Sequence, residues 1–153
     1  MRSFCYIFVS VAVIIALASA ADVGGRAEYV GGTMANLIGG TDGTIHATGL
    51  KNLSFTVSKG VIQVPYAQIN LLEYGQKVDR RVAMAVLISP LLIMSKSRKH
   101  FLTIGFVGPD GEQQAMVLRL EKGSVRPLLA SLEARTGIKV TYQDEEARKA
   151  GKG

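Results

Sequence analysis

Short apolar segments separated by glycine and proline constrain the fold of this chain most. Seven glycines fall between positions 24 and 43, and glycine at this density breaks helices and marks turns and bulges. Residues 53–58 alternate apolar and polar side chains, as a half-buried strand does. Similar short segments occur at 27–34, 44–48, 61–64, 69–74, 101–107 and 114–120, with turns at 39–43 and 108–111. The pattern predicts about seven strands.

One amphipathic helix follows the strands. A stripe of apolar side chains recurs at helical spacing between a capping serine and a terminating glycine; these residues are Ser124, Val125, Leu128, Leu129, Leu132 and Gly137. Residues 138–142 predict a short extended piece. Residues 144–153 are polar and lack periodicity, which predicts a disordered tail. The sequence therefore predicts a mainly β fold, a small antiparallel barrel or sandwich whose end is covered by the helix.

The first twenty residues are typical of a secretory signal. Arg2 is their only charge, an apolar run follows, and Ala18-Ser19-Ala20 supplies the small residues of a cleavage site. Cleavage after Ala20 is expected, and an uncleaved anchor is the alternative. We therefore expect a periplasmic or secreted protein, which can be membrane-associated. Because Cys5 is the only cysteine, a mature chain would have no disulfide or thiolate metal site, and export argues against a nucleic-acid partner.

Positive charge is concentrated in residues 77–100. This segment holds six basic side chains and one acidic side chain, a net charge of +5. Without Arg2 the chain carries 17 basic and 12 acidic residues, so the rest of it is neutral in sum. We expect the basic side chains to bind an anionic surface, with the neighbouring histidine contributing; the candidate residues are Arg80, Arg81, Lys96, Arg98, Lys99 and His100, beside Lys77.

An uncharged run of 14 residues, 82–95, separates the two basic groups. As a helix it would span about 21 Å, which is short of a bilayer core of about 30 Å, and Pro90 would kink it. Three interpretations remain open: the run packs in the core, enters a membrane interface, or docks on a partner or a second copy. The residues expected to make apolar contact are Leu87, Ile88, Leu91 and Leu92.

Several motifs together resemble a known domain family. They are Gly43-Thr44-Ile45, Leu53-Ser54-Phe55, Val64-Pro65-Tyr66-Ala67-Gln68-Ile69, residues 28–33 and 73–77, the hairpin at 100–111, and residues 129–137. Over residues 27–142 the chain resembles bacterial pleckstrin-homology-like and GRAM-like domains, many of them in exported proteins. The resemblance implies a bent antiparallel barrel of seven strands over residues 21–143, capped by a C-terminal helix, with an insertion at 76–100. It implies binding rather than catalysis.

Motifs for catalysis or cofactor binding are missing from the sequence. Members of the resembled family that bind phosphoinositides carry two basic residues in the loop between their first two strands. Here that loop, at 39–43, carries Asp42 as its only charge, so we do not predict a phosphoinositide site. His46 and His100 lack metal-site spacing, and neither a nucleophile elbow nor a phosphate-binding glycine loop occurs. We expect no enzyme, no cofactor and no metal. The predicted function is an exported binding module for an anionic membrane or envelope partner; the alternative is a protein-interaction or self-assembly module, and an oligomer is possible.

Overall fold

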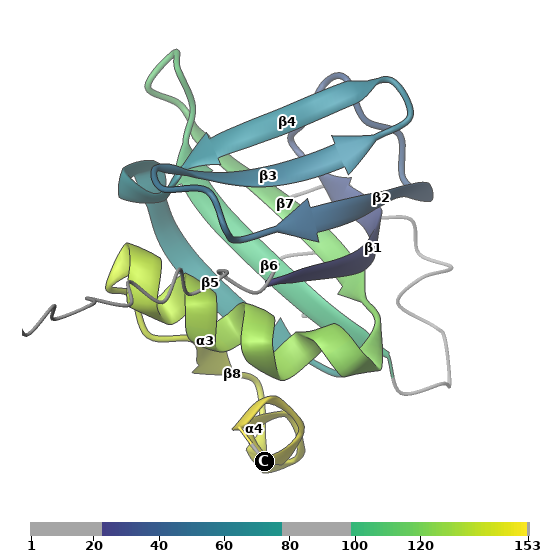
Figure 1. Cartoon of the computed structure of the whole chain (residues 1–153), viewed down its shortest axis with the longest axis vertical. Helices are drawn as coiled ribbons and strands as arrows, with labels where there is room; N and C mark the ends of the chain where they lie inside the picture. Colours follow the sequence, from purple (N-terminus) through teal and green to yellow (C-terminus); the bar gives the residue numbers. More distant parts are fainter. Residues whose placement is uncertain (1–22, 78–98, 153) are drawn as a thin grey trace, which may run out of the picture.

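The structure, a computed structural model, describes residues 23–77 and 99–152 (Figure 1). This part of the chain forms one sheet of eight strands with two α-helices. The strands are β1 (Gly24–Gly32), β2 (Thr41–His46), β3 (Asn52–Val57), β4 (Gly60–Pro65), β5 (Ile69–Gly75), β6 (His100–Val107), β7 (Gln113–Leu120) and β8 (Thr141–Tyr142). The α-helices are α3 (Val125–Thr136) and α4 (Glu145–Lys152), and two short 3-10 helices are η1 (Tyr66–Gln68) and η2 (Lys122–Ser124).

The strand order is β4-β3-β2-β1-β7-β6-β5-β8. All neighbouring strands are antiparallel except β8, which runs parallel to β5. The expectation of a mainly β fold with a C-terminal helix is confirmed. Strand β8 falls within the short extended piece expected at 138–142 and makes the eighth strand of the sheet. The sheet is mixed and open, so the expected barrel of seven strands is not confirmed.

The sheet bends so that its two halves enclose one core. Phe55 of β3 and Leu72 of β5 stand far apart in the strand order, yet both are fully buried in the same hydrophobic cluster. In Figure 1, β2, β3 and β4 lie in front of β6 and β7. A register shift between Tyr29 and Gly31 marks a bulge in β1, beside the kink that the glycine pair predicts. The first residues of the turn predicted at 39–43 do form a loop, but Thr41 to Gly43 already belong to β2.

Helix α3 crosses one end of the bent sheet (Figure 1). Its predicted stripe is buried in the core: Val125, Leu128, Leu129 and Leu132. Gly137 ends the helix with a φ of 73°, and its N–H donates to the Glu133 carbonyl at 2.9 Å, as predicted. The expected Ser124 cap is wrong, because its hydroxyl donates to the Glu121 carbonyl at 2.9 Å instead of serving the helix.

The expectation of a disordered tail at 144–153 is wrong. Residues Glu145–Lys152 form α4, which packs on α3, β5 and β8. The Ala147 N–H donates to the Asp144 carboxylate at 2.6 Å, which caps the helix start. Ala147 is fully buried and Gly151 lies against the Tyr142 ring. Because these contacts are made by small residues, the tail has no apolar stripe that would predict them, and the packed unit extends past residue 143.

Candidate anion-binding surface

Most of the predicted binding residues lie outside the described part of the chain. These residues are Arg80, Arg81, Lys96, Arg98, Leu87, Ile88, Leu91 and Leu92. The described residues from the same segment are Lys77, Lys99 and His100, which stand at its two boundaries.

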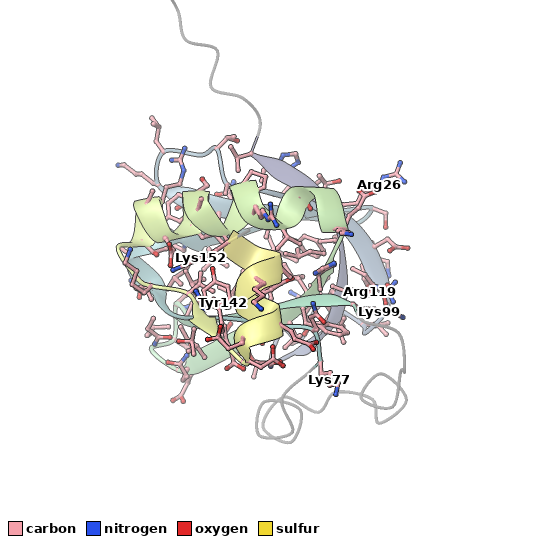
Figure 2. The ribbon with its side chains drawn as sticks, turned by 90° about the horizontal axis from the view of Figure 1, so that it is seen from below. Arg26, Lys77, Lys99, Arg119, Tyr142 and Lys152 are labelled. Atoms are coloured by element: carbon pink, nitrogen blue, oxygen red, sulfur yellow. The ribbon has the colours of Figure 1, made fainter. Side chains whose placement is uncertain are left out.

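Strand pairing brings those two boundaries to the same end of the sheet. Gly75, at the end of β5, pairs with Phe101, near the start of β6, so Lys77 and Lys99 both lie two residues beyond this pair at the same end of the sheet. His100 pairs with Leu120, which directly precedes the η2 and α3 region. Figure 2 shows Lys77 and Lys99 on the side of the fold that also carries Arg119.

Two further cations, Lys122 and Arg126, belong to this end. Lys122 lies close enough to His100 to act on its titration, and Arg126 acts on Tyr74. The Arg126 Nε also donates to the Ala150 carbonyl at 3.3 Å, which links α3 to α4. We call Lys77, Lys99, Lys122 and Arg126 the basic end. Glu121, directly before Lys122, is the nearest carboxylate in sequence and offsets part of this charge.

A buried tyrosine and a histidine anchor the basic end to the sheet. The Tyr74 hydroxyl lies 2.5 Å from His100 Nδ1, and the two rings stack with centroids 6.1 Å apart. Burial raises the pKa of Tyr74 to about 12, with a smaller rise from Tyr142. Burial, and then the charge of Lys122, lower the pKa of His100. Both shifts favour the neutral forms near pH 7, and the tautomer of the imidazole decides which of the two groups donates the hydrogen bond.

The C-terminal residues extend this network. The Tyr142 ring packs edge-on against Tyr74 with centroids 6.0 Å apart, and the Lys152 ammonium lies 5.7 Å from the centre of the Tyr142 ring. Burial raises the pKa of Tyr142, and the nearby Glu133 carboxylate adds to the rise. Figure 2 shows Tyr142 and Lys152 close together at α4. Strand β5, strand β6 and helix α4 therefore meet at one aromatic cluster.

A shallow groove of about 520 Å³ lies over β2, β1 and β7, beside the basic end. Its charged lining mixes two cations with three carboxylates: Arg26, Arg119, Glu28, Asp42 and Glu121. Arg119 forms a salt bridge with Glu28, and Glu28 stands directly opposite Asp42 across the strands. A groove with more carboxylates than cations does not favour an anionic ligand. Because Arg119 is paired with Glu28, it is not counted among the cations of the basic end.

The two histidines do not form a joint site. His46 ends β2 and His100 begins β6, so β1 and β7 separate them by three strand spacings, on the order of 14 Å. Within 23–77 and 99–152, no group of three or more His, Cys, Asp or Glu side chains is arranged to hold a metal ion. No helix in these ranges has the length and apolar character needed to cross a membrane.

Sequence reasoning found one half of this surface and missed the other. Lys77, Lys99 and His100 were found because they flank the uncharged run. Lys122, Arg126, Tyr74, Tyr142 and Lys152 were missed, since only strand pairing and the docking of α4 bring them to the same end. No protein-family model matches this chain, and no curated protein matches it in sequence.

Proposed function

We propose that this chain is an exported, non-catalytic binding module whose basic end holds an anionic membrane surface. The observation that carries the proposal is the convergence of Lys77, Lys99, Lys122 and Arg126 at one end of the domain. Each lysine or arginine close to an anionic bilayer contributes about 1 kcal/mol. The basic side chains of 78–98, which the sequence attaches to this same end, would add to that attraction.

We further propose that the domain is pleckstrin-homology-like. The first seven strands follow the order β4-β3-β2-β1-β7-β6-β5, every neighbouring pair is antiparallel, and α3 covers one end of the bent sheet. This arrangement supports the resemblance carried by the sequence motifs. In this interpretation β8 and α4 are additions to the family's plan, and the segment after β5 is its insertion.

Flotation with liposomes tests the membrane proposal. The chain beginning at Ala21 would be mixed with neutral or anionic vesicles at low and at high salt. We expect flotation with anionic vesicles only, and a loss of flotation as salt screens the attraction. An absence of flotation under every condition would contradict the proposal, as would flotation that is equal with neutral vesicles.

A charge-matched pair of variants locates the surface. Lys77→Glu/Lys122→Glu reverses two exposed side chains of the basic end, and Lys51→Glu/Lys59→Glu reverses two exposed side chains of the loops around β3. Both variants change the net charge by the same amount. For the first variant only, the loss of two attractive charges costs about 2 kcal/mol, or about thirtyfold in partitioning, and the repulsion of the two new carboxylates adds to this loss. Equal losses in the two variants would assign the binding to net charge rather than to this surface.

A second candidate function is strand-mediated association with a protein or with another copy. Among the described residues, β4 is the last strand at one side of the sheet, and its six residues carry no charge. Val61 on this strand is 56% exposed. An extended segment could pair with such an edge. Association that persists in high salt and is lost on Val61→Lys would favour this candidate over the membrane proposal.

A further inference from the structure

Strand β4 forms an open edge of the sheet. It is the last strand on its side, and Figure 1 shows it at the outer border of the front half. Four of its six residues, Gly60, Val61, Gln63 and Pro65, are exposed, and none of the six carries a charge. Its register with β3 runs without a shift, and within 23–77 and 99–152 no other strand pairs with it. An edge of this kind is a template for another strand.

The hairpin of β3 and β4 decides which backbone groups of β4 point to the open edge. Its turn has two residues, so the flanking residues Val57 and Gly60 form a hydrogen-bonded pair. Such pairs alternate along an antiparallel ladder, so every second residue after Gly60 directs its N–H and C=O to β3. The Tyr66 N–H, an even number of positions after Gly60, donates to the Lys51 carbonyl at 2.9 Å and confirms this alternation.

Two residues of β4 therefore direct both of their backbone groups to the open edge. They are Val61 and Gln63, which alternate with the residues that face β3. Pro65 is the third residue of this set and has no N–H, so the edge offers two donors and ends there. The side chains of Val61 and Gln63 lie on the face away from the core, whereas Ile62 is half-buried and packs against the core.

We infer that β4 pairs with β4 of a second copy of this chain, antiparallel and with Ile62 opposite Ile62. In this register Val61 of each copy stands opposite Gln63 of the other, and these two pairs exchange four backbone hydrogen bonds. Both N–H groups that β4 directs to the edge then have a partner. A shift of one copy by two residues would place Val61 opposite Pro65, or Gln63 opposite the turn residue Lys59, and would lose part of this pairing.

A second copy suits this edge because the edge is complementary to itself. A two-fold axis brings each residue close to its own counterpart, so a charged edge would repel itself, whereas β4 is uncharged. The same axis brings two half-buried Ile62 side chains together at the border of the core, where each covers the other. A longer foreign strand would gain no further donor beyond Pro65.

This inference rests on the strand-mediated candidate function and names its partner. The pairing uses no residue of the basic end, so it is independent of the membrane proposal. High salt screens the attraction to an anionic surface, but it does not remove hydrogen bonds between two uncharged strands. We therefore expect the pair to persist at a salt concentration that abolishes flotation.

Disulfide crosslinking tests the register in a chain whose only cysteine is removed by Cys5→Ser. The two residues at position 62 would form a non-hydrogen-bonded pair with Cα atoms about 4.5 Å apart, so Ile62→Cys should give a covalent dimer under mild oxidation. Val61→Cys alone and Gln63→Cys alone should stay monomeric, because like positions lie more than about 7 Å apart on the diagonal. A mixture of these two variants should crosslink. Equal yields in every sample, or no dimer in any, would overturn the inference.

Sedimentation over a concentration series, in high salt, tests the pairing without a crosslink. Gln63→Pro removes an outward N–H and leaves the ladder with β3 intact, whereas Gln63→Ala keeps this N–H and loses only the bond from Asn52 Nδ2 at 3.0 Å. Because Gln63→Pro removes two of the four hydrogen bonds, its dimer should dissociate at least about tenfold more readily than that of Gln63→Ala. Equal dissociation constants, or an unaltered chain that is monomeric at every concentration, would overturn the inference.

Flotation of the same two variants keeps the failures apart. Neither substitution touches the basic end, so we expect Gln63→Pro and Gln63→Ala to float equally with anionic vesicles. Absence of pairing with normal flotation would overturn this inference and leave the membrane proposal standing. A monomeric chain that holds another protein in high salt, and releases it on Val61→Lys, would keep the strand-mediated candidate but overturn the second copy as its partner.

Discussion

Ionisation of Tyr74 should weaken the fold at high pH. The hydroxyl is buried and its pKa is raised from 10.0 to about 12 in the folded chain. A raised folded pKa means that the unfolded chain loses its proton first, so stability is complete below pH 10 and falls as the pH rises toward 12. The two-unit difference corresponds to about 3 kcal/mol when both states are ionised, and to about 1 kcal/mol at pH 11.

The matched variant is Tyr74→Phe, which keeps the ring in the core and removes the hydroxyl. At pH 8 it should cost about 1 kcal/mol, because the bond to His100 is lost. Urea unfolding followed by circular dichroism at pH 8 and pH 11 then gives the decisive comparison. The unaltered chain should lose about 1 kcal/mol more than the variant between these pH values. Equal losses would refute the assignment of this pH dependence to Tyr74. It would also be refuted if the absorbance titration at 295 nm showed the same high-pH step in the variant as in the unaltered chain.

Two further predictions concern the same cluster. Since the pKa of His100 is lowered by burial and by Lys122, the unfolded chain takes up the proton first, and stability should fall as the pH drops below about 6.5. Urea unfolding at pH 7.5 and pH 5 should show a smaller loss for His100→Asn, and equal losses would contradict this cause. A Cβ at Gly151 would lie 2.5 Å from the Tyr142 ring, so Gly151→Ala should destabilise by about 1–3 kcal/mol. Gly123→Ala, where no atom lies within 4 Å, is the control in thermal unfolding; equal melting temperatures would show that the ring moves aside without cost.

The strands and α3 could be predicted because their signals are local. Leu53 and Phe55 alternate with polar neighbours within one strand, and Val125, Leu128 and Leu132 repeat within one helix. Each pattern is decided by residues a few positions apart. The prediction failed at the tail, where Ala147 and Gly151 form a face of small residues. This face stabilises the helix only because it packs near the Tyr142 ring. A packing contact of that kind cannot be read from periodicity.

The candidate site required knowledge of distant partners. Lys77 and Lys99 could be found from charge counting alone. The contributions of Lys122 and Tyr74 depend on the pairing of His100 with Leu120 and on the hydrogen bond between Tyr74 and His100, which join residues from β5, β6 and the start of α3. The burial of Val117 also needed the structure, because the alternation in β7 distinguishes Val117 from Leu118 without showing that both side chains are buried.

The parallel pairing of β8 with β5 sets a limit on how copies of this fold can assemble. At that side the sheet ends in a strand of two residues followed at once by α4, so among the described elements only β4 offers an edge of ordinary strand length. A fibre grows when each molecule has two compatible edges and a neighbour on both. In an association of copies through the sheet, β4 of one molecule pairs with β4 of another. The resulting pair leaves no edge strand of ordinary length for a third molecule. Association through the sheet would stop at two copies instead of continuing into a filament.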